Sequence, residues 1–97
     1  MTTYILLINW TDQGIRSVKD SAKRLDAARN MLGSMGGSFD KFYLTMGEYD
    51  MAAICEAPDD RVMARFTLTL AMAGNVRTKT LKAFSEVNYH DIIGSLS

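Results

Sequence analysis

Apolar residues occur along this chain in short runs that alternate with amphipathic segments. Residues 3–10 (TYILLINW) form a run rich in Ile, Leu and aromatic residues, and its length is typical of a strand. The hydroxyl of Thr11 or the carboxylate of Asp12 can cap a helix that starts there, and the glycines at 33, 36 and 37 provide its end. A single long helix is predicted in between, because apolar residues recur at three- and four-residue spacing, namely Ile15, Val18, Ala22, Leu25, Ala28, Leu32 and Met35.

The second half of the chain repeats this alternation. Residues 39–46 and 49–57 predict two strands joined across Gly47-Glu48 as a hairpin. Pro58 and the acids that follow it start a helix over 60–73, which is apolar nearly all round, so we expect it to be buried on more than one side. Residues 76–84 predict a last strand. The segment 86–97 predicts a C-terminal helical tail with apolar residues at helical spacing: Tyr89, Ile92, Ile93 and Leu96.

The order of these elements predicts the fold. Strand, helix, strand, strand, helix, strand is the ferredoxin-like βαββαβ arrangement of the α+β class. We expect an antiparallel sheet of order 4-1-3-2 with both helices on one face. With 97 residues, the chain is expected to form one domain over 1–97.

The strands are apolar on both of their faces. In the first strand Tyr4, Leu6 and Ile8 alternate with Ile5 and Leu7, whereas an antiparallel sheet with one wet face alternates apolar with polar residues. Because exposed apolar patches of this kind are rare on monomers, we expect a second copy to cover the open face, giving a homo-oligomer. The register of the hairpin decides which set faces the helices, and the sequence leaves that open.

The predicted topology brings three polar segments to one edge of the sheet. The end of the first strand carries Trp10, the turn carries Tyr49 and Asp50, and the last strand starts near Arg77. Arg77 is long enough to approach Asp50 across Trp10. Each residue also has a structural explanation, since Trp10 can close the core, Asp50 can bind turn amides and Arg77 can be a surface cation.

Charge and cysteine content restrict the classes of partner. The chain has 11 Lys and Arg against 11 Asp and Glu, for a net charge of zero, so nothing favours nucleic acid or an acidic membrane. The single cysteine, Cys55, is expected to be a buried strand residue in a reducing compartment. The apolar N-terminus has no basic lead-in and is too short to cross a bilayer, so we expect a cytoplasmic protein.

The sequence does not predict a metal or cofactor. One histidine, His90, and one cysteine cannot build a usual zinc site. The glycines at 33–37 follow a helix instead of opening one, so no nucleotide-binding loop is recognisable. We expect His90 to be an exposed residue of the tail.

Three blocks of the chain resemble the GYD-domain family: YILLINWTDQGIR, FYLTMGEYDMAAICEAPDD and GNVRTKTLKAF. The motif for which the family is named stands here as Gly47, Tyr49 and Asp50. The resemblance implies a dimeric α/β-barrel type of domain, in which copies pair through their sheets. It does not imply a particular activity, since similar folds serve as cofactor-independent monooxygenases, lactone isomerases, haem-degrading enzymes, stress-response proteins and ligand-sensing modules.

Two functions follow as hypotheses. The favoured one is binding of a small molecule, or its cofactor-independent conversion, in a cleft of the homo-oligomer. The alternative is a non-catalytic assembly or regulatory module that uses its apolar faces for protein contacts. A haem-handling role would need His90 in a pocket. In the favoured hypothesis Trp10, Tyr4, Tyr43 and Met51 form the wall, Asp50 is the anchor or base, Arg77 contacts an anion and Tyr49 is a further candidate.

Overall fold

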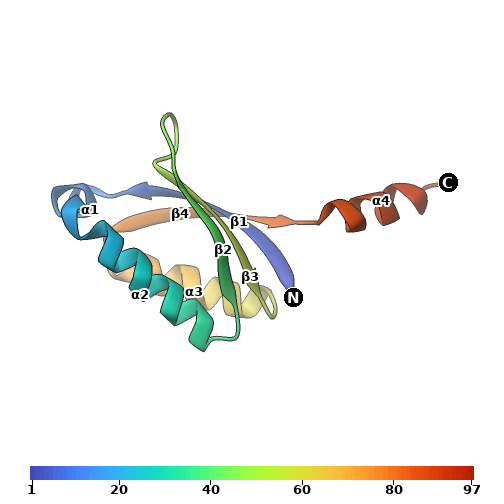
Figure 1. Cartoon of the computed structure of the whole chain (residues 1–97), viewed down its shortest axis with the longest axis horizontal. Coiled ribbons are helices and arrows are strands. Elements are labelled where there is room, and N and C mark those ends of the chain that lie inside the picture. The colour runs from blue at the N-terminus through green and yellow to red at the C-terminus, as the bar shows by residue number, and fades with distance from the viewer.

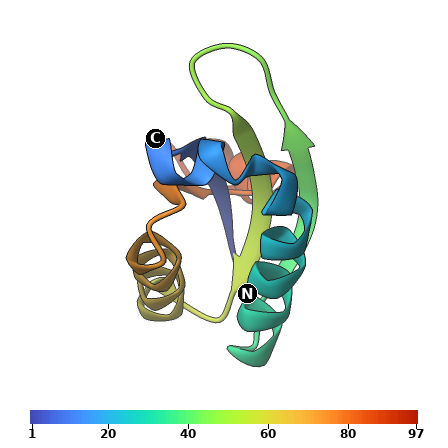
Figure 2. The same ribbon diagram turned by 90° about the vertical axis from the view of Figure 1, so that its left-hand side faces the viewer.

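The computed structural model describes all 97 residues and shows an α+β fold, a four-stranded antiparallel sheet with its two longer helices on one face and the C-terminal helix extending away from it (Figure 1). Seen from the end of the molecule, the two longer helices stand side by side against the sheet with a space between them (Figure 2). The elements are β1 (Thr2–Trp10), α1 (Asp12–Arg16), a 3₁₀ turn (Val18–Asp20), α2 (Ser21–Ser34), β2 (Ser38–Leu44), β3 (Met51–Ala57), α3 (Asp60–Met72), β4 (Val76–Ala83) and α4 (Glu86–Gly94).

The sheet has the order β2-β3-β1-β4, so β1 and β3 are its central strands. All three strand pairs are antiparallel. Ile8 lies opposite Met51 and Leu6 opposite Ala53. The strand order places the two most apolar strands, β1 and β3, in the middle of the sheet, where both can pack against the helices.

The structure decides which strand residues face the helices. Tyr4, Leu6 and Ile8 are buried on that side together with alternate residues of β3. Between the layers they meet Leu32 of α2 and Phe66 of α3, which are fully buried. The opposite face carries residues that are only partly buried or exposed: Ile5, Leu7, Ala52, Ile54 and Leu81.

The first helical segment differs from the single helix that the sequence predicts. It breaks at Ser17, whose backbone (φ −111°, ψ 32°) is not helical, into α1, a 3₁₀ turn and α2. Two close approaches place the start of α1 against Asn75, in the turn before β4. The N–H of Thr11 donates to the carbonyl oxygen of Asn75 at 3.0 Å. Gly14 lies so close to the same carbonyl that a Cβ there would be 1.9 Å from its oxygen.

The connection between β2 and β3 also differs from the prediction. The strands end at Leu44 and start again at Met51, so the tight turn at Gly47-Glu48 is replaced by a six-residue loop. The loop projects beyond the sheet (Figures 1 and 2). Its base is closed by the N–H of Thr45, which donates to the carbonyl of Asp50 at 2.8 Å.

Two helices leave apolar residues exposed. The carboxylate of Asp59 caps α3 by accepting from the N–H of Val62, as the sequence indicates. On the outer side of α3, however, Leu68 is 64% and Met72 83% exposed, so within one chain this helix is buried on one side only. No residue of α4 is buried. None of the helices is both long and apolar enough to cross a membrane.

Candidate functional site: a cleft between the helices and the sheet

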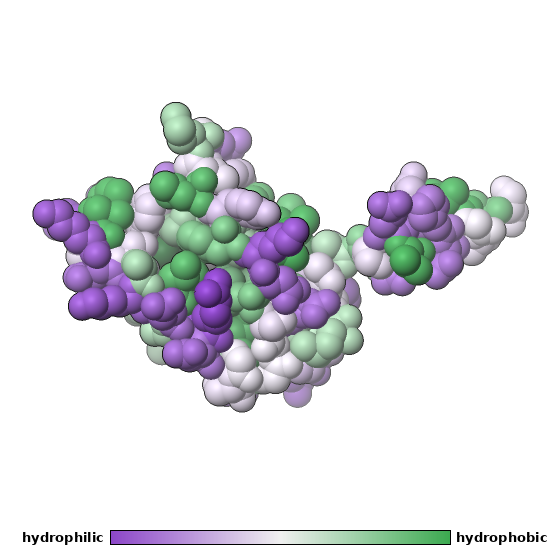
Figure 3. All heavy atoms as spheres, viewed as in Figure 1, coloured by the Kyte–Doolittle hydropathy of each residue, from purple (hydrophilic) through white to green (hydrophobic).

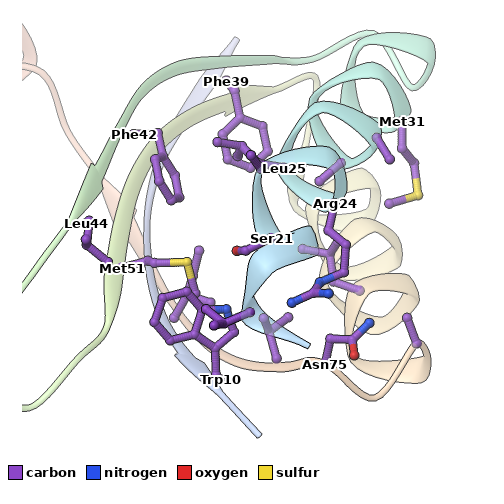
Figure 4. Close-up of a pocket in the computed structure, with 18 of the residues that line it drawn as sticks. Trp10, Ser21, Arg24, Leu25, Met31, Phe39, Phe42, Leu44, Met51 and Asn75 are labelled. Atoms are coloured by element: carbon purple, nitrogen blue, oxygen red, sulfur yellow. The ribbon is translucent and has the colours of Figure 1, made fainter. Parts of the chain in front are cut away.

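A cleft of about 700 Å³ lies between α2, α3 and the helix-facing side of the sheet (Figure 4). Of its 19 lining residues 15 are hydrophobic, a proportion typical of small-molecule sites. The strands contribute Trp10, Phe42, Leu44 and Met51 to one wall, and α2 faces them with Leu25 and several alanines. The volume falls in the range of about 300–1,000 Å³ that ligand pockets occupy.

Small side chains on α2 leave the cleft unfilled. Ala22, Ala27 and Ala28 all line it, at helix positions where larger side chains would reach the sheet. The core is filled near the C-terminal end of α2. There Leu32 is fully buried, and Phe39 packs edge-on against Phe66 with ring centres 5.7 Å apart. Large side chains thus fill the space between the helices and the sheet at one end of α2. Small side chains leave that space empty at the other end.

Arg24 is the only charged residue among those that line the cleft. Its guanidinium donates to the carbonyl oxygens of Ser17 at 3.0 Å and Gly14 at 3.2 Å. These bonds fix the cation beside the cleft and satisfy the carbonyls at the end of α1. The other polar lining residues are Ser21, Thr69 and Asn75. No carboxylate, histidine or cysteine lines the cleft, so it offers one cation and neutral polar groups, but no acid–base pair.

Asp50 lies beside the cleft wall and is held by backbone. Its carboxylate accepts a hydrogen bond from the N–H of Trp10 at 3.0 Å. Its own N–H donates to the carbonyl of Ile8 at 3.0 Å and to the side-chain oxygen of Asn9 at 2.9 Å. It does not line the cleft and forms no ion pair with Arg77. The geometry therefore gives Asp50 a positioning contact with Trp10.

The other residues singled out in the sequence are dispersed. Trp10 and Met51 line the cleft. Arg77 is exposed opposite Asn9 and borders a separate shallow depression with Arg16. Tyr43 is half exposed on β2, outside the cleft.

Tyr49 lies apart from the cleft, with the ammonium of Lys79 5.7 Å from the centre of its ring. Its carbonyl oxygen accepts from the hydroxyl of Thr45 at 2.6 Å, within the loop that carries it. The Gly-Tyr-Asp segment thus stabilises the loop and the end of β1 through its backbone and carboxylate, not through a shared pocket.

Tyr4 is buried in the core, outside the cleft. Its hydroxyl donates to the carboxylate of Asp60 at the start of α3. Burial, and then this hydrogen bond, raise the pKa of Tyr4 to about 12. The same hydrogen bond, together with Lys82 at 3.0 Å, lowers the pKa of Asp60. The group thus ties β1, α3 and β4 together.

Cys55 and His90 do not contribute to the cleft. Cys55 is fully buried, and burial raises the pKa of its thiol to about 12. His90 is on the exposed surface of α4, 3.5 Å from Glu86. Three His, Cys, Asp or Glu side chains do not come together anywhere in the structure in a way that could hold a metal ion.

The sequence interpretation missed the helix side of the cleft. The sequence pattern places Ala22 and Ala28 in the apolar stripe of one helix and does not single out Ser21, Arg24 or Ala27. The signal that could have found this side of the cleft is alanine at positions 22 and 28 of a stripe whose other members are larger, because small residues facing a sheet leave space.

The fold and the cleft define a class: small α+β domains with a ligand-sized apolar cleft between helices and sheet. Sequence comparison matches the GYD domain over residues 4–93. The chain therefore belongs to the GYD-domain family. A relative from Thermus thermophilus is 33% identical over 84 residues, which cover 86% of this chain and 88% of the relative. That protein is named "Glutamine synthetase and cystathionine beta-lyase binding protein".

Two solved structures share the fold. A crystal structure of a Thermus thermophilus protein has a TM-score of 0.54 at 23% identity and covers 88% of this chain and 95% of that one. A hypothetical protein from Pyrococcus horikoshii has a TM-score of 0.54 at 22% identity, covering 93% of this chain and 98% of its own. At this level of identity the likeness concerns the fold alone.

Proposed function

We propose that this protein binds an apolar small molecule in the cleft between α2, α3 and the sheet. The observation that carries the proposal is the cleft itself, with its ligand-sized volume and 15 hydrophobic residues among 19. Arg24 is its only cation. It favours a ligand that has one acidic or carbonyl group on an otherwise apolar body, because an apolar site orients its ligand through a few polar groups.

Binding is better supported than catalysis. General acid–base chemistry needs a titratable group within hydrogen-bond reach of the substrate. A guanidinium group is suited to binding anions and carbonyls and not to proton transfer, and Ser21 and Thr69 line the cleft without a neighbouring base. Asp50, Tyr49 and Arg77 remain candidates for a catalytic role only if a ligand reaches them from outside the cleft.

The test uses Trp10, the only tryptophan of the chain and part of the cleft wall. Purified protein is titrated with 1-anilinonaphthalene-8-sulfonate and with uncharged N-phenyl-1-naphthylamine, and quenching of Trp10 emission is followed. We expect both probes to quench it, with the anion binding more tightly. Native mass spectrometry of protein purified from its own host then looks for a retained ligand.

A matched pair of variants separates the cleft from other apolar surfaces. Ala22 lines the cleft and Ala64 does not, and both are exposed alanines on helices. Ala22→Phe places a ring in the cleft and is expected to weaken probe binding about tenfold or more, which corresponds to a loss of about 1.4 kcal/mol of binding free energy. Ala64→Phe is expected to leave probe binding unchanged. Equal binding by the two variants would contradict the proposal.

A second candidate function is a protein-binding module. It is favoured by the name of the Thermus thermophilus relative and by the exposed Leu68 and Met72 on α3. Its test is binding of the purified protein to glutamine synthetase and to cystathionine beta-lyase from the same host, measured by calorimetry. Leu68→Glu should abolish binding if α3 makes the contact, and Thr67→Glu on the same helix serves as the control.

The element order and the sheet order β2-β3-β1-β4 support a ferredoxin-like domain of the dimeric α/β-barrel type. In that interpretation a second copy covers the open sheet face and makes the protein a homo-oligomer. A fully buried, unpaired Cys55 agrees with a cytoplasmic location. The state of association is measured by light scattering.

A further inference from the structure

The C-terminal segment 85–97, which we term the arm, extends away from the rest of the molecule. Figure 1 shows α4 pointing outward from the end of β4, and Figure 3 shows it as a separate lobe on a narrow neck. Only Phe84 and Ser85 separate β4 from α4. Ser85 has an extended backbone and caps the helix by accepting from the N–H of Asn88 at 3.1 Å, so the helix starts in line with the strand.

The arm has the apolar stripe of a helix that packs against a surface. Residues at i, i+3, i+4 and i+7 share one helix face. Here those positions are apolar and 43–68% exposed: Tyr89, Ile92 and Ile93 on α4, and Leu96 two residues beyond its end. The remaining positions are mostly polar. A helix of nine residues has little stability in water without packing, so the stripe requires a surface that its own chain does not supply.

The chain exposes more surface than a compact monomer. A monomer of 10.8 kDa exposes about 5,500 Å², whereas this chain exposes 6645 Å². The excess of about 1,100 Å² is enough for one partner's share of a stable interface, which is about 800 Å².

The open face of the sheet is the matching surface. Ile5 lies opposite Ile54 and Leu81, and Leu7 opposite Ala52, which makes an apolar centre without a helix over it. Helix and face are also complementary in charge. The arm carries two acids, Glu86 and Asp91, and no Lys or Arg. The rim of the face carries three cations and one acid, namely Lys41, Arg77, Lys79 and Glu56.

We propose that the arm of each copy packs its stripe of Tyr89, Ile92, Ile93 and Leu96 onto the open sheet face of a second copy, so that two chains exchange their arms. The exchange covers both unpartnered surfaces at once, so in the exchanged dimer the partner's arm covers the open face and the two sheets do not pack directly on each other there. It places Glu86 and Asp91 against a rim of net positive charge. It is independent of ligand binding in the cleft, which lies on the other side of the sheet.

Variants of the full chain test the exchange by light scattering across a concentration series. The wild-type protein is expected to have twice the chain mass. Ile93→Glu places a charge in the stripe and is expected to weaken association at least a hundredfold, giving a monomer. Val87→Glu adds the same charge to a more exposed residue, 70% against 49% for Ile93, on the opposite side of α4 and is expected to leave the dimer intact. A monomeric wild type, or a dimer that survives Ile93→Glu, would overturn the proposal.

A cross-linking experiment identifies the surface. Two differently tagged chains, one with Ile93→Cys and one with Leu81→Cys, are mixed and oxidised. We expect a disulfide between the two chains. Replacing Leu81→Cys by Leu68→Cys on the outer side of α3 should give none. A cross-link to residue 68 but not to 81 would show that the arm binds elsewhere and would refute the assignment. Probe binding in the cleft is unaffected by either result, so this proposal and the proposed function fail separately.

Discussion

The carboxylate of Asp50 accepts a hydrogen bond from the backbone N–H of Trp10 at 3.0 Å. This bond connects the aspartate of the Gly-Tyr-Asp segment to the end of the neighbouring strand β1, where the indole forms part of the cleft wall. The segment thus contributes to the cleft indirectly, because its aspartate fixes the backbone that carries Trp10. Its aspartate is a positioning residue in this arrangement.

Removing the carboxylate of Asp50 is expected to destabilise the protein. Asp50→Ala leaves the N–H of Trp10 without its partner, and hydrogen bonds to charged groups contribute about 1.5–3 kcal/mol. Asp50→Asn keeps an acceptor oxygen and should cost less. Urea unfolding followed by circular dichroism measures the loss. Glu48→Ala, at an exposed position of the same loop, is the control and should change the free energy of unfolding by less than about 0.5 kcal/mol.

Two glycines of the helical region should respond in opposite ways to alanine. At Gly14 a Cβ would meet the carbonyl oxygen of Asn75 at 1.9 Å, so α1 must move off the turn between α3 and β4, at a cost of about 1–3 kcal/mol. At Gly33 nothing lies within 4 Å of the added carbon, and alanine stabilises a helix by about 0.5–1 kcal/mol. Thermal unfolding of both variants checks the signs. A stabilising Gly14→Ala would contradict the close approach of α1 to that turn.

Tyr4 makes stability depend on alkaline pH. The pKa of Tyr4 is about 12 in the folded chain against an ordinary value of 10.0. Because the pKa of Tyr4 is higher in the folded chain, its contribution to the free energy of unfolding is fully present below pH 10. This contribution is lost as the pH rises to 12. The free energy of unfolding should therefore fall above pH 10, less steeply in Tyr4→Phe. Identical slopes for the two proteins would be inconsistent with a buried phenol.

Asp60 gives the opposite dependence on the acid side. Its pKa lies below the ordinary value of 3.8, because Tyr4 and Lys82 hydrogen-bond its ionised form. Its contribution to stability is present above pH 3.8 and is lost as the pH falls through the lowered value. Lys82→Met removes one of the two donors, so its stability should change less than that of the wild type between pH 5 and 2. Urea midpoints across that range measure the difference.

The thiol of Cys55 should be unreactive until the chain unfolds. It is fully buried, and burial raises its pKa to about 12, so neither access nor thiolate is available at pH 8. Reaction with 5,5′-dithiobis(2-nitrobenzoate) is expected to follow the urea unfolding curve. Ser34→Cys adds a thiol at an exposed position and should react at once in the folded protein. Rapid reaction of the wild-type thiol without urea would contradict the packing of β3.

The sequence by itself determined the α+β class, the position of most helices and strands, and the family. Local signals suffice for these: apolar periodicity, the cap of Asp59 on α3 and the Gly-Tyr-Asp block. They also suffice for the exposed stripe of the tail, because helical spacing is a local property.

Only the tertiary structure decided where a ligand can bind. The choice of Leu6 and Ile8 over Ile5 and Leu7 as core residues depends on the register between strands, and a shift of one residue reverses it. The cleft depends on Ala22, Ala27 and Ala28 facing Trp10 and Met51, residues far apart in the chain. The break at Ser17 depends on Arg24 and on the approach of Gly14 to Asn75. Contacts of this kind arise when distant segments pack, so no pattern within one segment contains them.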